Sequence, residues 1–391
     1  MNAEVLYAAA HAEFPDTEPL GGGKAVADYL VREWRARQPF PLTVLSPRSL
    51  GLALDEPLAQ LGELDYARFC RRFEAAGTAE IMRRDPEKCV VLCNDISEGP
   101  DFAALGARGY RLATIFHVDV VEFFTKFYLR GLVPARVAAR WRWFSLMPDM
   151  LRLVFQKQLE CVRWSRRLVV PSPPMREMIL RCYPWCPAGK IVVLPWGKIA
   201  EPAQPAALPD VREEEFVVMT MSRLSPEKGI ERLLAALRLL DRRGVNLRVF
   251  ICGGPAYMQG RSYERKLRRL ARGLCRVTVE FTGHVTGPRK AALLARADLF
   301  VSPSRHESYG LTIAEAVAAG CRVISHSHYG AVGELVDCSH PEELAAAITR
   351  AAATGRARGA SLKTDSRKPA EETDASWRRL VELLGEITGT G

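Results

Sequence analysis

The sequence predicts an α/β protein of two doubly wound, Rossmann-like domains that face each other across a cleft. Three observations predict this class. The length of 391 residues fits two domains. The second half alternates short apolar runs with segments of helical period, and a proline-rich stretch separates the two halves. Near-continuous apolar strands in such an alternation are typical of a parallel sheet that helices cover on both faces.

The second half shows this alternation most regularly. Its apolar runs predict strands at Phe216–Met221, Leu247–Cys252, Val277–Thr282, Leu299–Pro303 and Arg322–Ser325. Helical spacing of apolar residues predicts the intervening helices at Gly229–Asp241, Tyr263–Gly273, Gly287–Ala297 and Leu311–Ala319. The ligand-binding edge of such a sheet is formed by the carboxyl ends of its strands.

The first half follows the same plan with weaker signals. Short apolar runs predict strands at Val5–Ala10, Leu42–Leu45, Val90–Asn94, Leu112–His117, Leu168–Ser172 and Ile191–Pro195. One helix is predicted at Ala25–Arg35, where Val26, Tyr29, Leu30 and Trp34 share a face.

Changes in composition and the proline-rich stretch indicate the domain limits. We expect an amino-terminal domain at 1–198, a linker at 199–209, a carboxyl-terminal domain at 210–372, and a helix at 373–391 that packs back on the first domain. Small and charged residues predict a mobile loop over Gly355–Ala375. Ser339 and Glu342 have the spacing of a capping box at the start of a helix.

Composition also excludes several classes of protein. With 48% hydrophobic and 26% charged residues, the chain is not wholly disordered, collagenous or a coiled coil. It has no apolar run of about 18 residues and no basic, apolar leader, so we expect a cytoplasmic protein, with peripheral association at the inner face of the membrane left open. The cysteines form no CxxC pair, which favours buried thiols over a metal site. The net charge of +10 favours anionic partners.

Glycines follow the first predicted strand and precede the first helix. Backbone N–H groups at Gly22 and Gly23 can approach an anion closely because these residues have no side chain. The run is neither a Walker loop nor G-x-G-x-x-G, so a plain flexible turn stays an alternative.

Two cations follow the first strand of the second half. Arg223 comes after the strand, and Lys228 lies at the start of the next helix. An arginine fork and a lysine point charge at the carboxyl end of a strand can hold a diphosphate. Two solvated charges without a ligand are the alternative.

Two carboxylates flank the start of a later helix. Glu307 lies in the loop after the strand Leu299–Pro303, and Glu315 lies inside the following helix. Gly310 and Leu311 would offer backbone N–H groups at the helix start. Carboxylates accept hydrogen bonds from sugar hydroxyls while amides bind phosphates, so the pattern suits a nucleoside diphosphate sugar. Acidic residues that merely favour the helix start are the alternative.

Several further motifs in the second half make the pattern specific. They are Ser222–Gly229, Gly253-Gly254-Pro255, Phe281-Thr282-Gly283, Val301–Ser304, Ala318–Ile324 and Gly330…Glu334. With them, the segment from 219 to 334 resembles the carboxyl domain of retaining family 4 glycosyltransferases, which have the glycosyltransferase-B fold. The first half matches more weakly, through Gly21–Gly23 and His117. The chain departs from the family where Trp196-Gly197-Lys198 stands before the linker and beyond Glu334.

The resemblance implies a role for each matching residue. Arg223 and Lys228 would hold the donor diphosphate, Glu307 the sugar hydroxyls and Glu315 the ribose. The backbone at Gly22, Gly23, Gly310 and Leu311 would line the phosphate and sugar, and His117 would lie over the donor sugar and face the acceptor.

The implied activity is transfer of a hexose from a nucleotide sugar with retention of configuration. We expect no cofactor and no metal, because the cations and helix starts can stabilise the leaving diphosphate and the chain has no Asp-x-Asp. The alternatives are a nucleotide-sugar epimerase or phosphorylase of the same fold and an inactive binding protein. The sequence leaves the sugar, base, acceptor and oligomeric state open.

A basic, aromatic segment at 122–167 bears on the acceptor. Aromatic side chains alternate there with Lys and Arg, a pattern that binds anionic membrane surfaces or nucleic acid. We expect an anionic membrane surface or a lipid-linked acceptor rather than nucleic acid. A pair of buried amphipathic helices with a solvated basic rim is the alternative.

Overall fold

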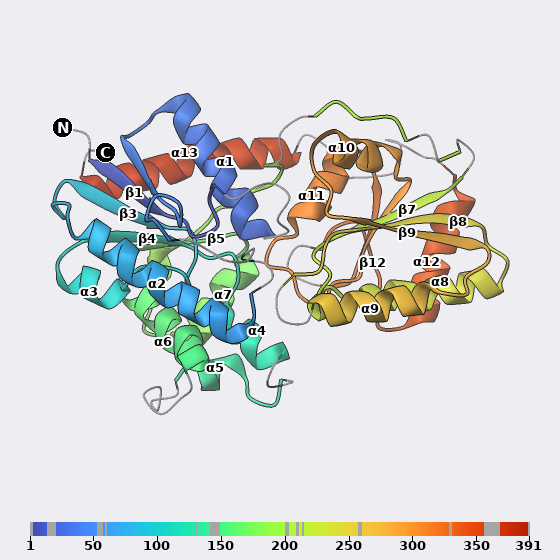
Figure 1. Cartoon of the computed structure of the whole chain (residues 1–391), viewed down its shortest axis with the longest axis horizontal. Coiled ribbons are helices and arrows are strands. Elements are labelled where there is room, and N and C mark those ends of the chain that lie inside the picture. The colour runs from blue at the N-terminus through green and yellow to red at the C-terminus, as the bar shows by residue number, and fades with distance from the viewer. Residues whose placement is uncertain are drawn as a thin grey trace. The chain divides into compact units, whose positions relative to one another are not determined.

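In the computed structural model of the chain, residues 3–13, 21–52, 58, 61–127, 129, 131–140, 149–199, 203–208, 211–212, 215–256, 260–327, 331–355 and 368–389 are described. They form two compact units (Figure 1). The first unit comprises Met1–Phe14, Gly22–Pro195 and Asp374–Gly391, and the second comprises Pro15–Gly21 and Trp196–Thr373. Each contains a six-stranded parallel sheet, which confirms the predicted fold class. That the two domains face each other across a cleft stays a prediction.

The first sheet has the order β2-β1-β3-β4-β5-β6. Its strands are β1 (Glu4–Ala8), β2 (Leu42–Leu45), β3 (Cys89–Cys93), β4 (Arg111–Ile115), β5 (Arg167–Val170) and β6 (Ile191–Val193). All neighbours are parallel and pair in register, as Tyr7 does with Val44 and Leu92. These six strands confirm the six apolar runs of the first half.

Helices cover both faces of the first sheet (Figure 1). One face carries α1 (Gly22–Arg37) and α13 (Lys368–Thr388), and the other carries α2 (Glu63–Ile81), α3 (Phe102–Ala107), α4 (Val120–Phe127), α5 (Ala135–Ala138), α6 (Asp149–Trp164) and α7 (Pro173–Cys182). The second group packs on one core cluster that includes Ile81, Phe102 and Phe155. The short turn η3 (Ala188–Lys190) precedes β6.

The second sheet has the order β12-β11-β10-β7-β8-β9. Its strands are β7 (Val217–Met221), β8 (Leu247–Cys252), β9 (Val277–Gly283), β10 (Leu299–Ser302), β11 (Arg322–Ser325) and β12 (Glu334–Leu335). The five predicted strands are confirmed. The short strand β12 was not predicted, because two exposed residues give no apolar run.

The second sheet is also covered on both faces (Figure 1). One face carries α8 (Ile230–Arg242), α9 (Gly260–Ala271) and α12 (Pro341–Ala353), and the other carries α10 (Gly287–Arg296) and α11 (Leu311–Ala318). Two separate core clusters result, with Leu237 and Ile348 in one and Leu293 and Ile313 in the other.

The proline-rich stretch at 199–209 is grouped with the second unit. Ala206 N–H donates to the Pro288 carbonyl oxygen at 3.1 Å, and Leu208 packs against the core cluster beneath α10 and α11. This part of the stretch is therefore attached to the surface of the second unit.

Two local predictions are wrong. The capping box at Ser339 does not form, because the N-cap of α12 is His340 and the Ser339 hydroxyl donates to Asp337 Oδ1 at 2.5 Å instead. The predicted loop at 355–375 ends early, because 368–375 form the first turns of α13. Residues 356–367 of that loop lie outside the described residues.

The carboxyl-terminal helix α13 packs within the first unit from Asp374 onward. The ring of Trp377 lies edge-on to that of Trp34, with centroids 5.3 Å apart, and Asp374 pairs with Arg37 at 3.0 Å. Among the described residues, no helix combines the length and apolar character that a membrane span requires.

Candidate functional site

The strand order of the second sheet places a topological switch point between β7 and β10. These strands are neighbours, yet the chain leaves β7 toward β8 and leaves β10 toward β11. The loops that follow them therefore diverge at the carboxyl edge, which is where doubly wound sheets bind ligands. Arg223, Lys228, Glu307 and Gly310 all lie in these two loops.

Arg223 and Lys228 occupy the loop between β7 and α8. This loop contains the turn η4 (Pro226–Lys228) and ends at Gly229, whose φ of 61° is left-handed. A Cβ atom at Gly229 would lie 2.5 Å from the Pro303 carbonyl oxygen. Glycine is therefore what lets this loop pack directly on the segment after β10.

The side chains of Lys228 and Glu307 form an ion pair across the two loops. Lys228 Nζ lies 2.7 Å from Glu307 Oε1, and the two side chains are only 12% and 14% exposed. Ser304 Oγ donates to the same carboxylate oxygen at 2.9 Å. Losing one member would leave the other as a poorly hydrated charge. The pair thus holds a cation and an anion next to each other where the two loops meet.

Arg223 is anchored by a buried acid in its own loop. Its Nη2 lies 3.6 Å from Glu227 Oε1, and 28% of its side chain is exposed. Glu227 also accepts a hydrogen bond from Ser225 Oγ at 2.5 Å. A guanidinium has five N–H donors and can bridge a carboxylate and a phosphate at once.

The start of α11 has the geometry of an anion site. Gly310 is its N-cap with a left-handed φ of 89°, and no side chain caps the helix. Leu311 is the first helical residue, whereas the N–H groups of Ile313 and Ala314 already bond back to Gly310. The first N–H groups of a helix and its dipole both favour a negative ligand.

Glu315 presents one engaged and one available carboxylate oxygen. Its Oε1 accepts from Lys290 Nζ at 2.7 Å, while its Oε2 is buried and has no hydrogen-bond partner among the described residues. A buried acceptor without a donor is costly, so a hydroxyl donor from a ligand would satisfy it. The sequence analysis missed Lys290, which lies in a different helix, α10, with no sequence pattern linking it to Glu315.

Tyr309 contacts the segment Trp196-Gly197-Lys198 before the linker, where the chain departs from the family pattern. Its hydroxyl accepts from the Gly197 N–H at 3.0 Å and donates to Glu372 at 3.2 Å. Tyr309 is adjacent to Gly310 in the chain, so this contact ties the loop before α11 to the residues around Trp196. Single-sequence reasoning gave no signal for it.

The remaining predicted residues belong to the first unit. Its strand order has a switch point between β1 and β3, and Gly22 and Gly23 begin α1. His117 follows β4, and its Nε2 lies 3.1 Å from Asn94 Oδ1. A Cβ atom at Gly23 would lie 3.6 Å from the His117 ring. Three residues that the sequence analysis assigned to the same substrate are thus neighbours.

A polar cluster surrounds His117 and was not predicted. Asn94 and Asp95 follow β3, and His11 follows β1 with Nδ1 3.1 Å from Asp95 Oδ2. Burial acts to raise the pKa of Asp95, but the charge and hydrogen bond of His11, helped by His117, lower it to about 2. The sequence signal that could have predicted this cluster is the presence of polar residues after two adjacent apolar strands.

The surroundings of His117 favour its neutral form, because they lower the pKa of the imidazole. Burial lowers the pKa of its imidazole, the attraction of Asp95 opposes this, and His11 adds to the lowering. The ring is therefore a hydrogen-bonding group rather than a fixed cation.

The described part of 122–167 has features of both alternatives, a buried helix pair and a surface that binds an anionic membrane. Phe124 packs edge-on against the buried Phe155, with centroids 5.7 Å apart, so α4 and α6 form a buried helix pair. Around α5, however, Leu132 is 84% exposed and Val137 47% exposed, beside the exposed Arg136. Tyr128, Arg130 and Trp141–Phe144 lie outside the described residues.

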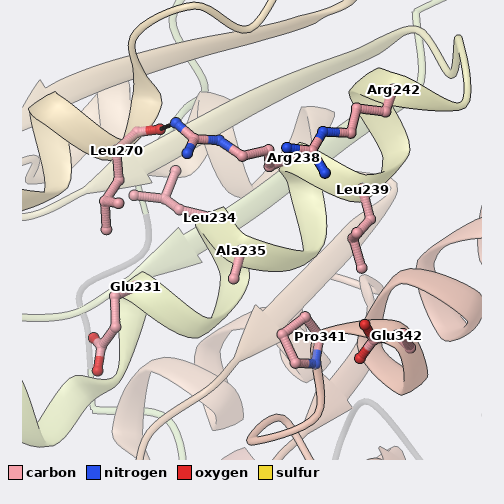
Figure 2. Close-up of a pocket in the computed structure, with 9 residues that line it drawn as sticks. All are labelled: Glu231, Leu234, Ala235, Arg238, Leu239, Arg242, Leu270, Pro341 and Glu342. Atoms are coloured by element: carbon pink, nitrogen blue, oxygen red, sulfur yellow. Dashed lines mark hydrogen bonds between the residues drawn. The ribbon is translucent and has the colours of Figure 1, made fainter.

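Other features of the described residues do not form part of the candidate site. A pocket of about 260 Å³ lies among α8, α9 and the start of α12, where Arg238 donates to the Leu270 carbonyl oxygen (Figure 2). It lies on the outer helices and none of the predicted site residues lines it. The cysteines are free thiols, buried except for Cys275. Within the described ranges, no group of three or more His, Cys, Asp or Glu is arranged to hold a metal.

Comparison with known proteins gives a family match within the second unit. Residues 208–358 match the family model described as glycosyl transferases group 1. The second unit carries a glycosyl transferases group 1 domain. Arg223, Lys228, Glu307, Gly310, Leu311 and Glu315 all lie within the matched residues.

Curated relatives of this glycosyl transferases group 1 domain share part of the chain. D-inositol 3-phosphate glycosyltransferase of Salinispora arenicola is 33% identical over 190 residues, or 45% of this chain and 42% of that protein. GDP-mannose-dependent alpha-(1-6)-phosphatidylinositol dimannoside mannosyltransferase of Mycobacterium tuberculosis is 32% identical over 143 residues, or 34% of this chain and 35% of that protein. The chain thus spans less than half the length of these relatives.

A solved structure shares the fold of the whole chain. Sucrose-phosphate synthase from Thermosynechococcus elongatus matches with a TM-score of 0.73, covering 100% of both chains at 18% identity. At this identity the likeness establishes a common architecture of two parallel-sheet α/β domains, and no more.

Proposed function

We propose that this chain is a glycosyltransferase that moves a hexose from a nucleoside diphosphate sugar to an acceptor hydroxyl. The observation that carries the proposal is the Lys228–Glu307 ion pair at the switch point of the second sheet, within a segment that matches the glycosyl transferases group 1 model. In the proposal, the lysine of this pair binds phosphate and its carboxylate binds the sugar. The names of the curated relatives, one of them dependent on GDP-mannose, support a nucleotide-sugar donor.

In the proposed complex, Arg223, Lys228 and the start of α11 at Gly310 and Leu311 bind the diphosphate. Glu307 accepts hydrogen bonds from the donor sugar, and the available Oε2 of Glu315 accepts one from the ribose. These assignments use each group for the ligand atom of complementary polarity. We propose that Gly22, Gly23 and His117 act on the same donor from the first unit.

In the proposed reaction, the bond between the anomeric carbon and the phosphate oxygen breaks and its electron pair leaves with the nucleoside diphosphate. The acceptor oxygen bonds to the anomeric carbon, and its proton passes to the departing phosphate. Attack on the face that the phosphate leaves would retain the configuration. Arg223, Lys228 and the α11 start stabilise the negative charge that develops, so the proposed reaction needs no metal and no cofactor.

A donor and acceptor panel tests the proposal. UDP-, GDP- and ADP-hexoses are incubated with the chain and with acceptors that include inositol phosphates, oligosaccharides and a lipid extract, and mass spectrometry follows both nucleoside diphosphate release and glycosylated products. We expect one donor to give both. Interconversion of the donor sugar without transfer would show an epimerase, and donor binding without any turnover would show an inactive binding protein.

We further propose that the acceptor is presented at an anionic membrane surface or is lipid-linked. The exposed Leu132 and Val137, beside the exposed Arg136 and Arg140, support this, because apolar side chains rimmed by cations bind the interface of anionic bilayers. The lipid in the name of the Mycobacterium tuberculosis relative points to the same class of acceptor.

Vesicle sedimentation tests the membrane proposal. We expect the chain to sediment with phosphatidylglycerol vesicles and not with phosphatidylcholine vesicles, and we expect Leu132→Asp with Val137→Asp to abolish this. Leu64→Asp is the matched control, because Leu64 is 72% exposed on α2, outside the segment. Equal sedimentation of the control and the double variant would contradict the proposal.

A further inference from the structure

The side chain of Asn94 has four hydrogen-bond contacts and is completely buried. Its Oδ1 lies 2.7 Å from the Tyr7 hydroxyl and 3.1 Å from His117 Nε2. Its Nδ2 lies 3.2 Å from the Gly23 carbonyl oxygen and 2.9 Å from Asp95 Oδ2. An amide of this kind offers two donors and an acceptor with two lone pairs, so every site of the Asn94 amide is used.

Two of these contacts fix the orientation of the Asn94 amide. The Gly23 carbonyl and the Asp95 carboxylate can only accept, and the carboxylate is held ionised by the low pKa of Asp95. The amide NH₂ must therefore face them. Exchanging the oxygen and nitrogen would place two acceptors against Oδ1 and leave the buried Nδ2 against Tyr7 and His117.

The fixed amide then determines the position of the proton on His117. Because Oδ1 of Asn94 can only accept, the His117 Nε2 that faces it must carry a hydrogen. The neutral imidazole has a single N–H, so Nδ1 keeps its lone pair. The backbone of Asn94 also forms a hydrogen bond with the His117 ring, so both ring contacts come from this one residue.

We propose that Asn94 is a positioning residue that holds His117 as the Nε2–H tautomer, so that Nδ1 accepts a hydrogen bond from a substrate hydroxyl. This proposal rests on the proposed function. A protonated ring, or one with its hydrogen on Nδ1, would meet the same hydroxyl as a donor. Asn94 thus determines whether His117 accepts or donates the hydrogen bond to the substrate hydroxyl.

The charged groups around His117 come from the loops after β1 and β3. Asp95 after β3 attracts a proton to the ring, while His11 after β1 opposes protonation, and Glu98 lies 3.5 Å from the far nitrogen of His11. Replacing the neutral Asn94 amide by a carboxylate would add a second anion beside the ring, which favours the imidazolium. Asn94→Ala should therefore change the tautomer of His117, whereas Asn94→Asp should change its protonation.

Nitrogen NMR of the full chain with ¹⁵N-labelled histidine tests the tautomer without reference to activity. The sequence has seven histidines, and His117→Gln identifies the signal. We expect His117 at pH 7.5 to show a pyrrole-type Nε2 and a pyridine-type Nδ1. Asn94→Ala should give averaged shifts of exchanging tautomers, whereas Tyr7→Phe, which removes the other donor to the same Oδ1, should leave the shifts unchanged. An Nδ1–H ring in the wild-type chain would overturn the proposal.

Asn94→Asp provides the second readout. We expect the pKa of His117 to rise by about one pH unit or more in the NMR titration, and the acid limb of the kcat/KM profile to move upward with it, with Tyr7→Phe again unchanged. A His117 pKa that stays in place in a folded Asn94→Asp chain would contradict the proposal. If the NMR results hold but no donor is turned over, the proposed function fails while the assignment of the ring stands.

Discussion

At the scale of single residues, the candidate site depends on charges held in poorly hydrated places. The ammonium of Lys228 and the carboxylate of Glu307 each have the other as a partner at 2.7 Å, and a donor would exchange that contact for its own phosphate and hydroxyl groups. Glu315 already keeps one oxygen without a donor among the described residues. The site is thus charged and preorganised before any ligand arrives.

We expect Lys228→Ala and Glu307→Ala each to abolish transfer, with kcat/KM reduced by about 100-fold or more, because an electrostatic contact to the reacting groups is lost. Steady-state kinetics with the active donor measures this, and circular dichroism checks that each variant is folded. Lys88→Ala is the matched control, since Lys88 is an exposed lysine paired with Asp85 in the first unit. Wild-type rates in either site variant would refute the assignment.

Asp95 should contribute stability that depends on pH. Burial opposes ionisation, yet His11 and its neighbours lower the pKa of Asp95 from 3.8 to about 2. A lowered native pKa stabilises the fold above the unfolded-state pKa and loses that effect as pH falls toward 2. At about 1.4 kcal/mol per pH unit, the contribution is about 2 kcal/mol at pH 7.

Urea unfolding of the wild-type chain and Asp95→Asn checks this. We expect the variant to be less stable at pH 7 and pH 5, and the difference to shrink between pH 4 and pH 2. If the difference in stability between the two proteins stays constant over that range, the ionised Asp95 carboxylate is not the source of the stabilisation.

At the scale of elements, most of the fold could be predicted because parallel strands are buried on both faces. Runs such as Leu247–Cys252 are apolar throughout, and the structure ends β8 at the same residues. Helix α2, in contrast, was missed, because its glycine and dispersed charges weaken the helical pattern over Glu63–Ile81. Tertiary packing on the first core cluster, where Ile81 is buried, stabilises it.

The start of α13 shows why a local pattern was misleading. Its polar first turns predicted a loop, but Thr373 Oγ1 donates to the Trp196 carbonyl oxygen at 2.6 Å and Ser376 Oγ to that of Pro195 at 2.6 Å. These contacts join residues nearly half the chain apart, so no window of sequence contains them. The same holds for Lys290 with Glu315 and for Asn94 with His117, whereas Arg223, Lys228 and Glu307 were found because a family pattern marks them.

Helix α13 should be a major source of stability for the first unit. Trp377 is 2% exposed and packs edge-on against Trp34 and Tyr29. We expect Trp377→Ala to lower the free energy of unfolding by about 3–5 kcal/mol, measured by denaturant unfolding. Arg378→Ala, at an exposed position one residue on, is the control and should change it by less than about 0.5 kcal/mol. Equal effects would contradict the packing role.

At the scale of the whole molecule, two sheets of similar plan are specialised differently. The switch point of the second sheet gathers Lys228, Glu307 and the start of α11, whereas that of the first gathers Asn94, Asp95 and the histidines. The first set suits an anionic donor, and the second suits hydroxyl groups. Under the proposed function, these groups match the diphosphate and the hydroxyl groups of a nucleotide sugar.

Transfer should not depend on a divalent metal, because Arg223 and Lys228 supply the positive charge. We expect full activity in excess EDTA and no gain on adding Mg²⁺ or Mn²⁺, measured as nucleoside diphosphate release. Loss of activity in EDTA that Mg²⁺ or Mn²⁺ restores would require a metal site that this account lacks.

The central claim is that the edge of the second sheet binds a nucleoside diphosphate sugar, and thermal unfolding with a panel of donors tests it most directly. A ligand that binds only the folded chain raises its melting temperature. We predict that one of the UDP-, GDP- and ADP-hexoses raises the melting temperature of the wild-type chain, and that the rise is lost in Lys228→Ala and reduced in Glu315→Gln but kept in Lys88→Ala. No response to any donor, or an equal response in all four proteins, would contradict the claim.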